Sequence, residues 1–138
     1  MKLSSLITDN ITELLIKIIE FTQARQKVLT LNINNIHTRG FVPKDLEVDD
    51  FSDLLHEAIS EHTRNGRLLL RDTENIKFGE AGSFEAKPIF DTYAKELLEK
   101  NSDEYLELQI NKLLENTLNQ RVAAELLKQK QGIVSIFE

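Results

Sequence analysis

The sequence of 138 residues contains no cysteine and no tryptophan, and it has only two prolines and five glycines. The lack of cysteine excludes a disulfide framework and a thiolate zinc site, and it leaves the redox compartment open. A chain of this length is long enough to bury an apolar core without such supports. A single compact unit is therefore the default expectation.

Basic residues are also in deficit, because 17 Lys and Arg stand against 23 Asp and Glu, for a net charge of -6. We do not expect duplex nucleic acid or an anionic membrane as the main partner, since both bind proteins through clustered Lys and Arg. Asp9, Glu13 and Glu20 interrupt the apolar pattern near the N-terminus. We therefore expect neither a cleaved secretory signal nor a membrane-spanning run.

The first block of the sequence, residues 6–32, has the period of one long amphipathic helix. A second set of seam positions, also seven residues apart, is apolar toward the N-terminus and becomes polar at Arg25 and Asn32. Polar residues in such a seam cost stability but restrict register and partner choice. The predicted pairing positions, seven residues apart, are Ile7, Leu14, Phe21 and Val28.

The last block, residues 105–137, repeats this pattern, with pairing positions at Leu113, Gln120, Leu127 and Val134. We predict a mainly α fold in which the two long terminal helices pair as an antiparallel coiled coil. Two ordinary bundle helices are the plainer alternative. We divide the chain into helical segments 1–36 and 102–138 and a central segment 37–101. The predicted register sets Ile7 opposite Val134, Leu14 opposite Leu127, and Val28 opposite Leu113.

The central segment contains both prolines and four of the five glycines, a composition that indicates turns and loops. Within it, "DDFSDLLHEAISEH" predicts a short amphipathic helix, with Asp49 or Asp50 as N-cap and an end at Asn65-Gly66. Seven carboxylates and no Lys or Arg occupy residues 45–61, which favours a solvated acidic face over a docking patch. Residues 68–88 are expected to be extended or loop-like.

Reactive chemistry is nearly absent from the sequence. His37, His56 and His62 lack the four-residue helical spacing that places two imidazoles on one metal ion. No HExxH, GxSxG or phosphate-binding glycine motif occurs. We expect no catalytic, cofactor-binding or metal-binding residues, and we predict that the chain is not an enzyme.

The stretch "LNINNIHTRGF", residues 31–41, ends the first helical block with three asparagines and a glycine. Asparagine side chains satisfy backbone groups freed at a helix end, and glycine permits a positive φ. A plain helix cap followed by a surface loop is one interpretation. The other is that these amides also form hydrogen bonds between subunits of an assembly, because unpaired buried amides are costly.

The flanks of this stretch complete the spacing R-x3-L-x2-N-I-x-N-x2-T-x-G-F-x3-D, from Arg25 to Asp45. This spacing resembles the N-terminal signature of the bacterial flagellar rod and hook protein family, which runs close to L-A-x-N-I-A-N-x-x-T-P-G-Y. Arg39 stands where the family usually has proline. The residues "FVPKDLEVDDF", and "ENTLNQ" followed by "LLKQK" near the C-terminus, are similar to the proximal rod branch.

The resemblance implies a structural subunit of the flagellar basal body that self-assembles and transmits torque. It implies export by the flagellar type III apparatus without cleavage, and a place in the periplasmic rod. The implied partners are further copies of the chain, the rod subunits FlgC, FlgF and FlgG, the protein FliE, and the MS ring. The expected assembly motif is Asn32, Ile33, Asn35, Thr38, Gly40 and Phe41. The alternative is a soluble cytoplasmic adaptor or regulator that binds one partner through its amphipathic terminal helices.

Overall fold

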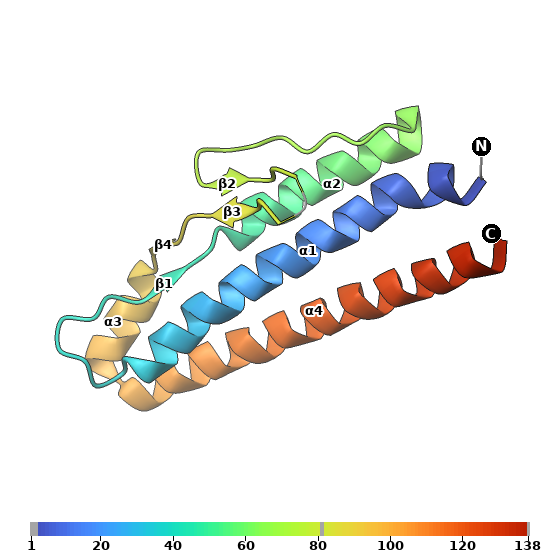
Figure 1. Cartoon of the computed structure of the whole chain (residues 1–138). Helices are drawn as coiled ribbons and strands as arrows, with labels where there is room; N and C mark the ends of the chain where they lie inside the picture. Colours follow the sequence, from blue (N-terminus) through green and yellow to red (C-terminus); the bar gives the residue numbers. More distant parts are fainter. Residues whose placement is uncertain (1–2, 81, 138) are drawn as a thin grey trace.

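Two long helices run antiparallel along the molecule, and most of the segment between them folds against the first (Figure 1). The computed structural model describes residues 3–80 and 82–137, and for residues 3–9 and 133–137 it describes the backbone alone. The predicted mainly α fold, with paired terminal helices and a central helix and extended segment, is confirmed. The helices are α1 (Leu3–Asn34), α2 (Val48–Asn65), α3 (Thr92–Lys100) and α4 (Ser102–Phe137).

Two short antiparallel strand pairs organise the central segment. Strand β1 (Lys44–Asp45) pairs with β4 (Ile89–Phe90), and β2 (Ile76–Lys77) pairs with β3 (Glu85–Ala86). The first pair sets Lys44 opposite Phe90, so the chain that leaves α1 lies beside the chain that enters α3. This pairing brings residues 44–45 and residue 91 to the same end of the molecule (Figure 1).

Helix α2 ends as predicted but begins differently. Its N-cap is Glu47, and the prediction of Asp49 or Asp50 as N-cap is wrong. The two aspartates lie in the first turn, where negative charge still interacts favourably with the helix dipole. The Glu47 side chain makes no cap bond and accepts a hydrogen bond from Asn75 Nδ2 at 3.1 Å.

The C-cap of α2, Gly66, has φ 68°, and its backbone N–H donates to the carbonyl of His62 at 3.0 Å. Gly66→Ala is expected to lower the free energy of unfolding by about 1 kcal/mol, because a Cβ is strained at this φ. Gly132→Ala is the matched control: Gly132 lies inside α4, and among the described residues no atom beyond its chain neighbours and the backbone of its own helix lies within 4 Å of an added Cβ. There alanine favours the helix and should raise stability by up to about 0.5 kcal/mol. Urea unfolding measures both, and equal effects would contradict the strain argument.

Helix α3 was not predicted from the sequence. It has nine residues, and Ala94 is its one buried residue. Asp91 caps its first turn, accepting a hydrogen bond from the backbone N–H of Ala94 at 3.0 Å. Asn101 then ends α3 and caps α4, since its Oδ1 accepts from the N–H groups of Asp103 and Glu104. Such a short helix shows too few turns for its periodicity to be recognised.

The apolar core lies between α1, α2 and the β2–β3 hairpin. The rings of Phe21 and Phe51 are stacked with centroids 3.9 Å apart, and Phe78 and Phe84 pack around them. Buried aromatic pairs add to the free energy of area burial, about 0.5 to 1.5 kcal/mol for each pair. The other buried members of this cluster are Leu46, Leu54 and Ile76.

A fully buried lysine fixes the β2–β3 hairpin on α1. Lys17 Nζ donates to the carbonyl oxygens of Phe78 at 2.9 Å and Glu80 at 3.1 Å, and it pairs with Glu20 at 3.1 Å. The other carboxylate oxygen of Glu20 accepts from the N–H of Gly82. A buried charge requires such partners, so Phe78, Glu80 and Gly82 of the hairpin are held at defined positions on α1.

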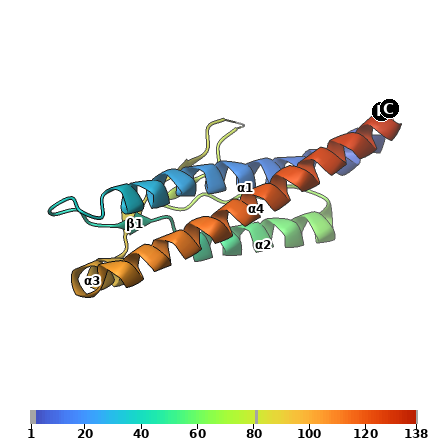
Figure 2. The ribbon, with the colours of Figure 1, turned by 90° about the horizontal axis from the view of Figure 1, so that it is seen from below.

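Helix α4 packs on another side of α1, through side chains that are mainly polar or small. Figure 2 shows α4 crossing α1 at an angle, with α3 at the start of α4. The buried residues of α4 in the described part of the chain are Tyr105, Gln109, Asn116 and Ala123. Asn116 Nδ2 donates to the carbonyl of Thr22 at 2.8 Å. The small Ala123 allows the two helices to approach closely.

Candidate functional site

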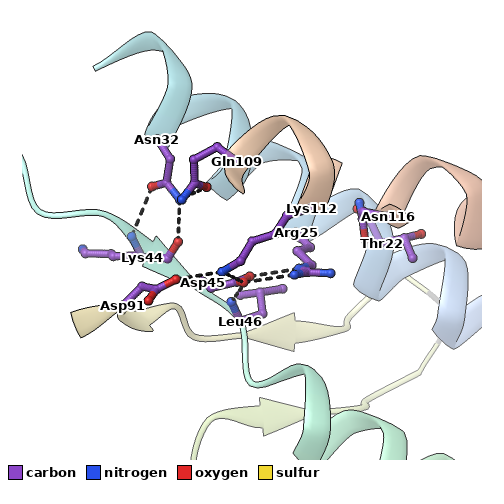
Figure 3. A network of polar contacts seen from close by, with 10 residues as sticks. All are labelled: Thr22, Arg25, Asn32, Lys44, Asp45, Leu46, Asp91, Gln109, Lys112 and Asn116. Carbon is purple, nitrogen blue, oxygen red and sulfur yellow. Dashed lines mark hydrogen bonds and ion pairs between the residues drawn. The ribbon is translucent and has the colours of Figure 1, made fainter. Parts of the chain in front are cut away.

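Asn32, in the last turn of α1, joins three elements through one amide. The residue is 1% exposed. Its Nδ2 donates to the carbonyl of Lys44 at 2.7 Å and to Oε1 of Gln109 at 2.9 Å (Figure 3). Its Oδ1 accepts from the backbone N–H of Lys44 at 3.1 Å. The amide therefore fastens β1 and α4 to the end of α1.

An ion network lies beside Asn32 (Figure 3). Arg25 donates from Nε to Oδ1 of Asp45 at 2.9 Å and from Nη2 to Oδ2 at 3.0 Å. Lys112 on α4 bridges Oδ2 of Asp45 at 3.0 Å and Oδ2 of Asp91 at 2.8 Å. Two cations thus face two carboxylates from four elements. We use the term junction for the group of residues formed by Arg25, Asn32, Asp45, Asp91, Tyr105, Gln109 and Lys112.

Burial and charge shift the titration of the junction in defined directions. Burial alone would raise the pKa of the Asp45 carboxyl, but the hydrogen bonds and charges of Arg25 and Lys112 outweigh burial and hold this pKa below its ordinary value. Burial alone would lower the pKa of Lys112, but the hydrogen bonds and charges of Asp91 and Asp45 outweigh burial and raise this pKa. Burial, helped by the charge of Asp91, raises the pKa of Tyr105 to about 12.

Tyr105 closes the junction from the start of α4. The residue is fully buried, and its hydroxyl donates to the carbonyl of Asn32 at 2.9 Å. Carbonyl groups in the last turn of a helix have no partner within the helix, so this bond satisfies one of them. The end of α1 and the beginning of α4 are thereby tied together by both the side chain and the backbone of Asn32.

The remaining residues of the predicted assembly motif form a local turn. Asn35 Nδ2 donates to the carbonyl of Leu31 at 2.8 Å, and the hydroxyl of Thr38 donates to Oδ1 of Asn35 at 3.0 Å. Gly40 has φ 78°, as the turn requires. Thr38 and Gly40 are exposed, whereas Ile33, Asn35 and Phe41 are half-buried.

These contacts show that the Asn32 and Asn35 amides bond within the chain, as the helix-cap interpretation predicts, while additional hydrogen bonds between subunits stay a prediction. The Asn32 amide uses its hydrogen-bonding groups within the chain, and Asn35 is engaged in the turn. The physical reason is proximity: β1 returns past the end of α1 and presents both backbone groups of Lys44 to Asn32. The motif is therefore an intramolecular junction followed by a capped turn.

The predicted helix-pairing residues divide between two faces. Leu14 and Phe21 are buried, but Phe21 stacks on Phe51 of α2, and Val28 packs against the same aromatic cluster. The pairing role predicted for Phe21 and Val28 is thus corrected, because α1 has neighbours on two sides. Leu113, Gln120 and Leu127 are half-buried, whereas Gln109, Asn116 and Ala123 are buried. Ile7 and Val134 lie outside the residues whose side chains are described.

The register of the helix pair agrees with the predicted one at the junction. The predicted register sets Val28 opposite Leu113, and in an antiparallel pair it also sets Asn32, four residues after Val28, opposite Gln109, four residues before Leu113. The 2.9 Å hydrogen bond between the side chains of Asn32 and Gln109 agrees with this register. The buried face of α4 is centred on residues 109, 116 and 123, which lie three or four positions from the predicted seam residues 113 and 120. Sequence reasoning missed Gln109, Lys112 and Asp91. Gln109 and Lys112 belong to a polar line on α4 that resembles a solvated face, and Asp91 lies just before α3, a helix that was not predicted.

The junction has the chemistry of a structural connection. Its charges are paired, and the one buried side-chain nitrogen or oxygen without a partner in the described part of the chain is Gln109 Nε2. Among the described residues, no three His, Asp or Glu side chains are grouped to hold a metal ion. No helix in that same part of the chain is long and apolar enough to cross a membrane.

The chain was compared with protein families, curated proteins and solved structures. No family model matches it, and neither a curated protein nor a solved structure does.

Proposed function

We propose that this chain is a structural subunit of the bacterial flagellar basal body and that it resembles FlgB, the proximal rod protein. The observation that carries the proposal is the junction. Arg25, Asn32 and Asp45 belong to the spacing that resembles the rod family, and they meet there in two adjoining sets of hydrogen bonds, Arg25 with Asp45 and Asn32 with the backbone of Lys44. Residues that lie up to twenty positions apart in the sequence thus take part in the same structural connection.

The geometry suits a subunit that carries mechanical load. The two long helices are fixed to each other at one end by the Tyr105–Asn32 and Asn32–Gln109 bonds, and further along by Asn116. Directional hydrogen bonds and paired charges resist sliding of one helix along the other better than apolar contacts, which are non-directional. A subunit built in this way transmits torque without catalysis.

The remaining parts of the proposal come from the resemblance. They are export through the flagellar type III apparatus without cleavage and a position in the periplasmic rod. The proposed neighbours are further copies of the chain, FlgC, FlgF, FlgG, FliE and the MS ring. An assembling subunit needs surfaces for several neighbours at once, and long paired helices present such surfaces along their whole length.

Deletion of the gene is the test. We expect a strain without the chain to lose swimming and to lack rods in purified basal bodies, and plasmid-borne wild type to restore both. A tagged copy should be found in the basal bodies. Normal swimming with intact rods would overturn the proposal. A stable monomer found only in the cytosol would favour the helical adaptor instead.

A further inference from the structure

A groove of about 450 Å³ lies between α1, α2 and α4, and we call it the helix groove. Helix α1 lies between the other two helices and forms the floor, and α2 and α4 form the walls (Figure 1). The apolar side chains that line it include Leu15 and Ile18 of α1, Val48 and Leu55 of α2, and Val122 and Leu126 of α4.

The walls of the helix groove carry exposed apolar side chains. Val122 is 57% exposed and Leu126 is 46% exposed. Ile59, which lies one turn of α2 beyond Leu55, is 49% exposed. In a four-helix bundle, the two helices that flank a third also contact a fourth helix, which buries side chains in these places. The helix groove has the position of that fourth helix.

The groove has an acidic end and an apolar end. Helices α2 and α4 run in the same direction, away from the junction (Figure 1). The lining begins with Asp49 on α2 and Glu115 on α4, at the end nearer the junction. Leu55 follows Asp49 by six residues and Val122 follows Glu115 by seven, which corresponds to roughly 10 Å along either helix. The far end is therefore lined by apolar side chains from both walls.

The two carboxylates at the acidic end are free to bind a cation from outside. Asp49 and Glu115 are exposed, and neither forms an ion pair with a described residue. Arg25 also lines the groove, but its side chain is only 6% exposed and donates to both carboxylate oxygens of Asp45. The charge that this end presents to solvent is therefore negative.

We infer that the helix groove receives a basic amphipathic helix of another protein. The apolar face of that helix lies on Leu55, Val122 and Leu126, and a Lys or Arg roughly 10 Å along its axis meets Asp49 and Glu115. Opposite charges at one end fix the direction in which such a helix docks and disfavour acidic partners. The inference does not depend on the proposed function, because it uses only the shape and the charges of the groove.

Two synthetic helical peptides are the probes. The basic probe has leucines three and four residues apart over two turns, and two lysines about seven residues before them, to match the spacing of the groove. The acidic probe has glutamates in place of the lysines. Fluorescence anisotropy with the full-length chain at low ionic strength measures binding of both. The basic probe is expected to bind at least about tenfold more tightly, and added salt should reduce this difference.

Variants of the walls test where the basic probe lies. Val122→Asn should weaken its binding at least about fivefold, because it removes apolar contact without adding charge. Leu31→Asn is the matched control, since Leu31 is 56% exposed and is not among the residues that line the groove. All side chains changed are exposed, so the fold should be retained, which circular dichroism checks.

Charge variants test the acidic end. Asp49→Asn combined with Glu115→Gln should reduce the preference for the basic over the acidic probe to less than about threefold. Glu96→Gln combined with Glu99→Gln removes the same charge from the exposed surface of α3, outside the groove, and should leave the preference unchanged.

Four results would overturn the inference. Equal binding of the two probes would show that the charges do not select the partner. Equal losses in the wall and control variants would show that the probes bind elsewhere. No saturable binding of the basic probe would show that the groove does not accept such a helix. Self-association in sedimentation that Val122→Asn weakens and Leu31→Asn does not would assign the groove to a second copy of the chain, although its α4 brings the further exposed carboxylates Glu107 and Glu125.

Discussion

Asn32→Ala is expected to lower the free energy of unfolding by about 3 kcal/mol, because it leaves buried polar groups without partners. Alanine would remove the acceptor of the Lys44 N–H, the donor to the Lys44 carbonyl and the donor to Gln109. Solvent cannot replace these bonds without entering the junction, since Asn32 is 1% exposed and Gln109 is fully buried.

Asn35→Ala is the control for that experiment. Asn35 is half-buried and makes only the local bonds to Leu31 and Thr38, so its loss should cost less than about 1 kcal/mol. Urea unfolding followed by circular dichroism compares the two variants. If the free energy of unfolding falls by the same small amount in both variants, the Asn32 amide does not stabilise the junction. A strain with Asn35→Ala alone then tests whether the turn has any separate role in rod assembly.

Asp45→Asn should destabilise the protein by about 3 kcal/mol, since breaking a buried ion pair leaves its partners uncompensated. The side chain of Arg25 is only 6% exposed and that of Lys112 is 23% exposed, so neither cation is fully solvated after the change. Glu57→Gln is the surface control: its partner Arg71 is 65% exposed, and the loss of that pair should be close to zero.

The effect of Asp45 should depend on pH in a predictable direction. Its folded pKa lies below its ordinary value of 3.8, so its contribution is present above that value and is lost as the pH falls through the lower folded pKa. Lys112, with a raised pKa, keeps its contribution until the pH rises above its ordinary value of 10.5. The difference in stability between wild type and Asp45→Asn should therefore be flat from roughly pH 5 to 9 and shrink in acid. A difference that persists unchanged at pH 2 would contradict this account.

The long helices and α2 could be predicted from the sequence because their apolar side chains repeat with the helical period. Gly66 also marked the end of α2 correctly, since only a residue tolerant of positive φ fits there. The two-sided environment of α1 could not be predicted in this way. Periodicity shows that Phe21 is buried, but Phe51 and α4 are equally plausible neighbours for a buried ring.

The junction could be predicted only in part. Asn32 and Asp45 stood out through their spacing, but the direction in which they bond depends on contacts across long stretches of chain. Gln109 is 77 positions from Asn32, and Lys112 is 67 positions from Asp45. A glutamine and a lysine at helical spacing normally indicate a solvated face, and only the return of β1 past α1 turns that face inward.

The position of the aromatic core has a consequence for synthesis on the ribosome. Every residue assigned to that cluster in the described part of the chain lies between positions 18 and 86, and α4 begins only at Ser102. Chains grow from the N-terminus at about 5 to 20 residues per second, and folding can start before they are complete. The core can therefore close while α4 is still being made, whereas the junction contacts of Tyr105, Gln109 and Lys112 can form only after those residues of α4 have been added.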